Sequence, residues 1–199
     1  MLIKHQILEE DKINKAHASS LIWAGNGIFR YDKRGEFETI TCHCPVVTPG
    51  LAVLDSDFQL LVPKVPEKLV IQVLETVKKY GNLERLFYLY WRKTGWELLE
   101  PMQEGSQTNC RSLDPYPQAA PIEIHSHGRG EAFFSNTDNL EENGFRVSIV
   151  LGGVGNELEI AARACVHGKF LPICPSEVLE NINSYCHVIS QPSSVKFRR

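Results

Sequence analysis

Two histidines and an aspartate near the middle of the chain have the types and spacing of metal ligands. His125 and His127 follow the mainly apolar stretch 121–124, and side chains two residues apart in a strand share one face, about 6.6 Å apart along it. Asp138 comes eleven residues after His127, beyond a glycine-rich turn that lets the chain double back. Two imidazoles and one carboxylate, with a fourth position left to water, form the ligand set of a catalytic zinc site. The spacing therefore predicts hydrolytic zinc chemistry.

The same residues also have an interpretation without a metal. A pair of histidines on a strand is commonly solvated or packed against its neighbours. Ser135 and Asp138 have the spacing of a capping box, in which the serine caps a helix and the acid lies in its first turn. Taken singly, these pieces leave a purely structural role open.

The full spacing resembles a known motif. His125, His127, Ser135 and Asp138 match all four defining positions of His-x-His-x7-Ser-x2-Asp, the signature of the JAB/MPN (JAMM motif) zinc metalloproteases, here of bacterial type. The resemblance implies a hydrolase, a zinc-dependent peptidase or isopeptidase, whose zinc ion (Zn2+) is bound by the two histidines and Asp138. It also implies that Ser135 donates a hydrogen bond to the oxyanion of the tetrahedral intermediate.

A catalytic carboxylate is still needed outside the motif, to take a proton from water and pass it to the leaving amine. In the family that the chain resembles, this residue is a glutamate on a strand after the first helix. Glu84 fits that place, 41 residues before His125 and soon after a predicted helix. Glu123 is the alternative because it shares a strand face with the two histidines, although this adjacency better suits a supporting or solvated group.

The resemblance also implies a class of substrate. The chain length and the β-rich N-terminal segment are similar to bacterial JAB-type proteins that occur beside ParB-like and E1-like partners. This implies a ubiquitin-like or sulfur-carrier protein as substrate, with an E1-like protein as a further partner. The flexible C-terminal tail of such a substrate could add as a strand beside the active-site sheet.

Two alternatives stay open. One is a non-catalytic JAB-like scaffold or binding module that keeps the metal. The other is an unrelated β-rich binding protein in which the histidine pair is structural or binds another metal. The chain also departs from the family pattern, because Gly128 replaces the usual proline and the strand after Glu84 lacks glycine. These departures weaken the substrate analogy without removing a ligand.

The elements around the motif must bring its residues together. The clearest is a helix over 67–80, which has one apolar face, Pro66 at its start and Gly81 at its end. The remaining predictions are a strand hairpin over 83–101, a surface loop over 103–120, a short helix over 135–144, strands over 145–151 and 158–166 joined by a hairpin turn, and a final helix over 175–183. This order resembles an α+β, α/β/α-like domain of the cytidine-deaminase type, with a central mixed sheet flanked by helices.

The chain is predicted to contain three parts. Residues 1–65 form a β-rich N-terminal subdomain, because short apolar runs alternate there with turns such as 25–27 and 32–36. Residues 66–190 form the JAB/MPN-like metalloprotease domain. Residues 191–199 form a flexible tail.

Composition argues against several classes of partner. The 199 residues carry a net charge of −3 without a basic block, which argues against binding to nucleic acid or to an anionic membrane. No apolar run approaches the ~20 residues of a membrane span, and the N-terminus lacks an apolar signal core. Six scattered cysteines do not resemble a disulfide framework, so we expect a cytoplasmic protein. Cys42-His43-Cys44 lacks a second pair at zinc-finger spacing and is predicted to end a strand.

Overall fold

The protein divides into two compact units. The computed structural model describes residues 3–10, 12–114 and 120–189. The units are Met1–Pro63 and Lys64–Arg199, so the division lies two residues before the boundary predicted at Val65. The tail predicted for residues 191–199 lies outside the described residues.

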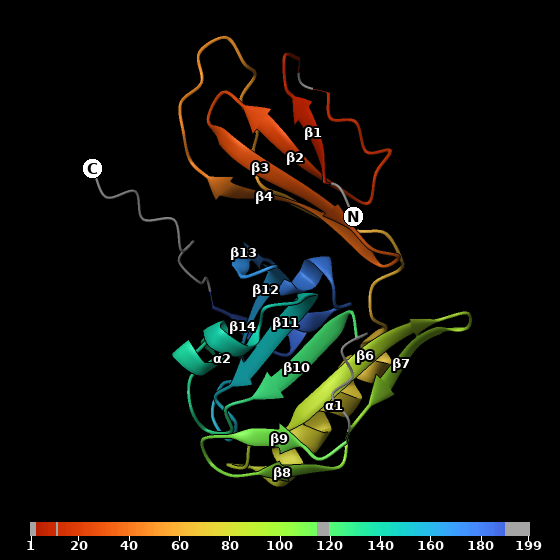
Figure 1. The fold of residues 1–199 in the computed structure, drawn as a ribbon. Helices are drawn as coiled ribbons and strands as arrows, with labels where there is room; N and C mark the ends of the chain where they lie inside the picture. The colour runs from red at the N-terminus through yellow and green to blue at the C-terminus, as the bar shows by residue number, and fades with distance from the viewer. Residues whose placement is uncertain (1–2, 11, 115–119, 190–199) are drawn as a thin grey trace. The chain divides into compact units, whose positions relative to one another are not determined.

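The first unit is a five-stranded sheet whose strands follow the order of the chain (Figure 1). Strand β1 (Lys4–Ile7) runs parallel to β2 (Ser19–Ala24), and β3 (Gly27–Lys33), β4 (Phe37–Cys44) and β5 (Asp57–Leu60) continue the sheet in antiparallel fashion. The position predicted for residues 42–44 is confirmed, because they end β4. One apolar cluster forms the core of this unit: Leu8, Ile22, Ala24, Phe29, Tyr31 and Ile40.

The second unit contains a seven-stranded mixed sheet of order β13-β12-β11-β10-β6-β7, with β14 paired to β12. The central strands β10 and β11 are parallel, whereas their outer neighbours β6 and β12 are antiparallel to them. The strands are β6 (Leu86–Arg92), β7 (Gly95–Leu99), β10 (Ile122–Ser126), β11 (Phe145–Gly152), β12 (Glu159–Val166), β13 (Lys169–Ile173) and β14 (His187–Val188). Strands β8 (Gln103–Gly105) and β9 (Cys110–Ser112) form a separate pair, so the surface loop predicted over 103–120 is wrong for these residues, and its residues 115–119 lie outside the described part of the chain. The predicted hairpin between β11 and β12 is confirmed.

Helix α1, Glu67–Tyr80, confirms the predicted helix at both ends. Pro66 precedes it with extended backbone, and Gly81 ends it with a φ of 64°, a conformation that glycine adopts without a steric penalty. Its 14 residues are fewer than the ~20 of a membrane span. No helix in the described part of the chain is long and apolar enough to cross a membrane.

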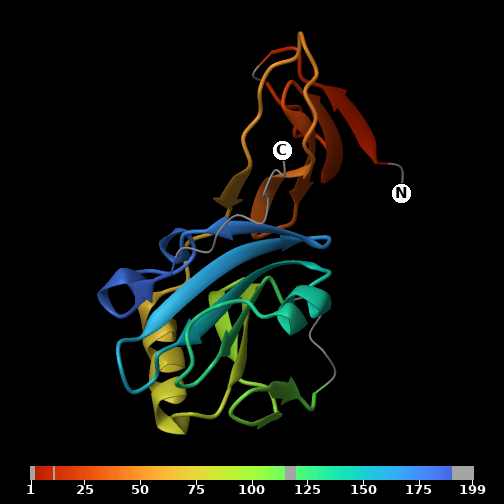
Figure 2. The ribbon, with the colours of Figure 1, turned by 90° about the vertical axis from the view of Figure 1, so that its left-hand side faces the viewer.

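The seven-stranded sheet has two chemically different faces. Helix α1 packs on one face, where its Val70, Val73 and Leu74 share an apolar interior with Ile124 and Ile149. Helix α2 (Asn136–Glu141) lies on the opposite side of the sheet (Figure 2). Because successive side chains of a strand point to opposite faces, the residues between the apolar ones face α2, and many of them are polar: Glu123, His125, Arg146, Ser148 and Arg163.

The predicted helix-flanked α+β fold is wrong. The described chain is mostly β, with three sheets and only two α-helices, of 14 and 6 residues. Two single-turn 3₁₀ helices, Pro175–Glu177 and Ile182–Ser184, replace the helix predicted over 175–183. Asn181 between them has a left-handed backbone (φ 52°), which interrupts a right-handed helix. Helix start signals therefore did not produce helices where no long amphipathic run follows them.

The buried centre of β11 gives a test of the fold. Ile149 is fully buried, so Ile149→Ala removes apolar contacts and leaves a cavity, which is expected to lower the free energy of unfolding by about 2–5 kcal/mol. Urea unfolding followed by circular dichroism measures the change. Leu140→Ala is the control because this side chain is 76% exposed, and its effect is expected to stay within about 0.5 kcal/mol. Equal losses in the two variants would contradict the described core.

Candidate metal centre

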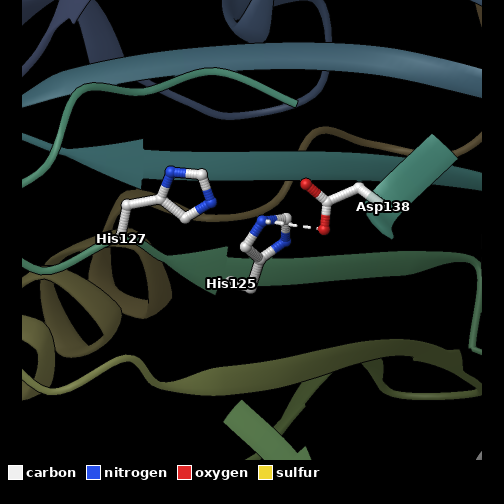
Figure 3. Close-up of side chains that lie close together, drawn as sticks. All are labelled: His125, His127 and Asp138. Carbon is white, nitrogen blue, oxygen red and sulfur yellow. Dashed lines mark ion pairs between the residues drawn. The ribbon is translucent and has the colours of Figure 1, made fainter. Parts of the chain in front are cut away.

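Three predicted ligands meet beside the end of strand β10 (Figure 3). His125 is the penultimate residue of this strand and is buried, whereas His127 follows just beyond the strand end. Nε2 of His125 lies 3.6 Å from Oδ1 of Asp138, and the two imidazole rings are 5.2 Å apart between centroids. Within the described residues, these three side chains form the one group of metal-ligating type, with ligand atoms all within 4.8 Å of one another.

The turn after β10 determines how His127 is oriented. Its backbone N–H donates to the carbonyl of Leu151 at 2.8 Å, which extends the pairing of β10 with β11. Its Nδ1 lies 3.0 Å from the carbonyl oxygen of Glu131, an acceptor, so Nδ1 carries the proton. In the neutral tautomer that makes this hydrogen bond, Nε2 is the nitrogen that can bind a metal ion.

A glycine allows this turn to lie close to a neighbouring segment. Gly128 has a φ of 54°, and a Cβ there would approach the backbone of Asn82 to 2.8 Å. Proline, with φ held near −65°, cannot adopt this conformation. Both the backbone conformation and the nearness of Asn82 therefore favour glycine at position 128.

Asp138 divides its two carboxylate oxygens between two tasks. Oδ2 accepts hydrogen bonds from the backbone N–H of Ser135 at 2.6 Å and from its hydroxyl at 2.7 Å. The backbone N–H of Asp138 donates back to Oγ of Ser135 at 3.2 Å, which completes a capping box at the start of α2. Oδ1 is the oxygen directed toward His125. A capping role and a metal-ligand role of Asp138 are therefore compatible, because each uses a different carboxylate oxygen.

The donor set fits a zinc ion. Within the described chain, Nε2 of His125 is buried without a hydrogen-bond partner, and burial lowers the pKa of this imidazole, so the ring is neutral and its nitrogen can bind a metal. In a tetrahedral zinc site with bonds of about 2.0–2.2 Å, neighbouring ligand atoms are about 3.3 Å apart. The 3.6 Å contact between His125 and Asp138 is close to that value. Two nitrogens and one carboxylate oxygen also match the ligand types that zinc prefers.

Glu84 is placed beside this group by the segment between α1 and β6. Its backbone N–H donates to the carbonyl of Ser106 at 2.7 Å, and the next N–H, of Arg85, donates to Oγ of Ser126 at 3.0 Å. Only 8% of Glu84 is exposed. Burial, together with the nearby negative charge of Asp138, raises the pKa of the Glu84 carboxyl to about 7.

Glu123, the alternative base, has a different environment. Its Oε2 accepts a 2.6 Å hydrogen bond from Nη1 of Arg146, and both residues are buried on the sheet. The guanidinium compensates the carboxylate charge where little water can solvate it. Of the two candidates, Glu84 has the raised pKa that suits proton transfer near neutral pH.

Two aromatic rings beside the ligands were missed from the sequence. Phe133 lies edge-to-face against His127 with ring centroids 4.9 Å apart, and Phe134 lies 6.3 Å from His125. Phe133 is 48% exposed and therefore forms an apolar wall of the site that reaches solvent. Two adjacent phenylalanines inside an otherwise polar turn are the sequence feature that could have revealed it.

A buried polar network under α2 was also missed. Glu142, at the C-terminal end of this helix, and Arg163, on β12, are both buried and form an ion pair of 2.6 Å. Arg163 stands in the sequence Ala-Ala-Arg-Ala-Cys-Val, and a charge within such an apolar strand indicates a buried partner. The partner itself was not predictable because it lies 21 residues away, in another element.

No protein-family model matches this chain, and no curated protein matches its sequence. The case for a metal centre therefore rests on the arrangement of the side chains.

The capping box gives a test of the helix that carries Asp138. Ser135→Ala removes the hydroxyl that bonds both the backbone and the carboxylate of Asp138, so it is expected to lower the free energy of unfolding by about 0.5–2 kcal/mol. Chemical denaturation of the metal-free protein measures this loss. Thr137→Ala, on the exposed side of the same helix, is the control and is expected to leave stability unchanged or slightly raised. A Ser135→Ala variant as stable as Thr137→Ala would contradict the cap.

The raised pKa of Glu84 predicts how the stability of the metal-free protein depends on pH. Between the ordinary value of 4.5 and about 7, the folded protein holds a proton that the unfolded chain has lost. Raising the pH through this window therefore lowers the free energy of unfolding of the parent protein. Glu84→Gln does not show this loss, because its side chain has no carboxyl group to ionise. The melting temperature of the parent relative to Glu84→Gln is expected to fall between about pH 5 and pH 8, as measured with chelator present. A difference in melting temperature that does not vary with pH would contradict the raised pKa of Glu84. Glu97→Gln, at an exposed position, is the control for loss of a carboxylate.

Proposed function

We propose that this protein is a zinc-dependent peptidase or isopeptidase. Its substrate would be a peptide or isopeptide bond next to the C-terminal tail of a ubiquitin-like or sulfur-carrier protein. One observation carries the proposal: His125, His127 and Asp138 have ligand atoms within 4.8 Å of one another, and a buried carboxyl of raised pKa, Glu84, lies close enough to Asp138 to sense its charge. Metal ligands with a neighbouring proton acceptor are the parts that hydrolysis requires.

The chain supplies the ligands and the proton transfer. A zinc ion bound by His125, His127 and Asp138 would contribute Lewis acidity, which polarises a carbonyl group and makes water more acidic. Glu84 would accept a proton from the attacking water on its carboxylate and then donate that proton to the nitrogen of the leaving amine. Burial raises the pKa of this carboxyl above its usual value, which suits a group that must both accept and donate a proton.

The substrate class and the partners come from the resemblance of the His-x-His-x7-Ser-x2-Asp motif to the JAB/MPN zinc metalloproteases. An E1-like partner and a cytoplasmic location belong to the same proposal. The six cysteines support the location, because all of them are free thiols, as expected in a reducing compartment. The net charge of −3 supports a protein substrate rather than a nucleic acid.

One observation favours a second candidate, a non-catalytic scaffold or binding module that keeps the metal. The resemblance assigns Ser135 to the oxyanion, but a hydroxyl has a single proton, and this one is donated to Oδ2 of Asp138. Ser135 could stabilise an oxyanion only by giving up that bond. If Ser135 keeps its hydrogen bond to Asp138, the site retains its metal ligands but lacks a hydroxyl that donates to the oxyanion.

Metal content and turnover together test the proposal. The purified protein is expected to bind one zinc ion per chain, and His125→Ala to lose it. A ubiquitin-like protein carrying a C-terminal fluorogenic amide, and a lysine-linked conjugate of it, are the probes of hydrolysis. Glu84→Gln is expected to keep the zinc ion and lose roughly 100-fold or more in kcat, because it cannot accept a proton. Glu97→Gln, at an exposed position on β7, is the matched control with parent activity.

Each other outcome has a definite meaning. Absence of stoichiometric zinc in the parent protein contradicts the metal centre and favours an unrelated binding protein. Equal hydrolysis by the parent and Glu84→Gln contradicts the role of Glu84. Zinc binding without turnover of either probe contradicts the peptidase and favours the scaffold.

A further inference from the structure

The zinc ligand on α2 is held in place by a group of residues that is not part of the motif. We infer that Arg163, acting through Glu142 and Asn139, is a positioning residue that fixes α2 and thereby sets the distance from Asp138 to His125. This inference rests on the proposed metal centre. Arg163 would then affect metal affinity from strand β12, although it does not itself bind the metal ion.

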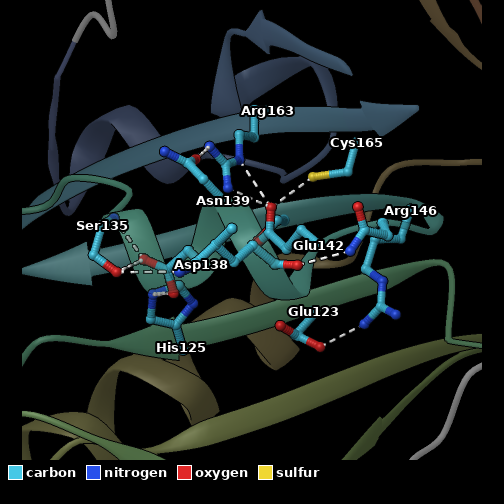
Figure 4. Close-up of polar contacts among 12 residues, drawn as sticks. Glu123, His125, Ser135, Asp138, Asn139, Glu142, Arg146, Arg163 and Cys165 are labelled. Atoms are coloured by element: carbon cyan, nitrogen blue, oxygen red, sulfur yellow. Dashed lines mark hydrogen bonds and ion pairs between the residues drawn. The ribbon is translucent and has the colours of Figure 1, made fainter. Parts of the chain in front are cut away.

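Arg163 contacts α2 through all three nitrogens of its guanidinium (Figure 4). Nε and Nη2 donate to Oε2 of Glu142 at 2.9 and 2.6 Å, and Nη1 donates to Oδ1 of Asn139 at 2.6 Å. The planar fork of arginine allows these bonds to form together, whereas the single ammonium of lysine cannot reproduce the arrangement.

The same guanidinium also holds the chain that leads into α2. Its Cζ lies 3.9 Å from the ring centre of Phe134 and 3.9 Å from that of Phe170. Phe134 immediately precedes Ser135, the N-cap of α2. Arg163 therefore contacts the residue before the N-cap, a residue within the helix and the residue that caps its C-terminal end.

Glu142 receives further hydrogen bonds from the sheet. The hydroxyl of Ser148 on β11 donates to Oε1, and the thiol of Cys165 on β12 donates to Oε2 at 2.7 Å. The carboxylate of Glu142 thus joins the C-terminal end of α2 to two strands. A buried carboxylate with this many donors is held in one position.

The helix needs such contacts because it cannot hold itself. It has six residues, none of them buried, and a helix this short is unstable without tertiary contacts. Polar and cation–π contacts with Arg163 take the place of an apolar face. Loosening them is expected to release Asp138, whereas His125 and His127 are held independently by the pairing of β10 and β11.

Zinc affinity and backbone exchange test this role. Arg163→Lys keeps the positive charge and loses the fork, so zinc affinity, measured by competition with a chromophoric chelator, is expected to fall about tenfold. The tetrahedral absorption band of bound Co2+ is expected to weaken in parallel. In the metal-free variant, the amides of Asn139 and Glu142, which donate to the carbonyls of Ser135 and Asp138, are expected to exchange about tenfold faster.

Arg146→Lys is the matched control. Arg146 is also buried on this face of the sheet and also pairs with a glutamate, but that glutamate, Glu123, lies on β10 and not on α2. Its replacement by lysine is expected to leave the exchange of the α2 amides unchanged and zinc affinity within about threefold of the parent. Asn139→Ala, which removes a single contact of Arg163, serves as a milder variant if Arg163→Lys does not fold, and a smaller loss of affinity is expected.

The outcomes separate this inference from the proposed function. If the parent binds zinc and folded Arg163→Lys, or Asn139→Ala in its place, shows parent affinity and parent exchange, the positioning role is overturned and the metal centre stands. If the parent binds no zinc, the proposed function and the metal-positioning role are both overturned, and faster exchange in Arg163→Lys would show only that Arg163 fixes α2. Equal losses in Arg163→Lys and Arg146→Lys would also overturn the positioning role, because any buried arginine would then have the same effect.

Discussion

The division of the Asp138 carboxylate between two partners is the constraint on which the site depends. One oxygen accepts both hydrogen bonds from Ser135 and starts α2, and the other is directed at His125. The helix start and the proposed metal ligand are therefore the same side chain. Any change that displaces the cap also displaces the ligand, since both depend on the same side chain.

The sheet that carries the site has a different chemistry on each face. On one face, apolar side chains pack under α1, and this burial provides the hydrophobic stabilisation of the second unit. On the other face, buried charges meet in pairs, Arg146 with Glu123 and Arg163 with Glu142. Buried charges are tolerated only when they are paired and hydrogen-bonded, so this face has little freedom to rearrange. That rigidity is what a metal site requires of its surroundings.

The electrostatics of the site favour a cation. Burial and the nearby charge of Asp138 raise the pKa of Glu84, and burial lowers the pKa of His125, so two carboxyl groups lie close together with an imidazole that carries no compensating charge. Without a metal ion, a proton on Glu84 would reduce the repulsion between the carboxyl groups of Glu84 and Asp138. A divalent cation would reduce it more strongly and would favour the ionised form of Glu84, so metal binding and proton release are linked.

The sequence by itself predicted the grouping of His125, His127 and Asp138, the capping box, helix α1 and the β11–β12 hairpin, because each depends on short spacings or on local periodicity. Only the tertiary structure decided the fold class, since the 175–183 segment formed two 3₁₀ helices and residues 103–105 and 110–112 paired as strands, which local signals did not specify. It also showed that Glu84 and Glu123 have different surroundings, because Asp138 beside Glu84 and Arg146 paired with Glu123 both come from distant parts of the chain. The support of α2 by Arg163 was also decided by the tertiary structure. Buried charges are paired across strands and helices, and that pairing exists only once the chain has folded.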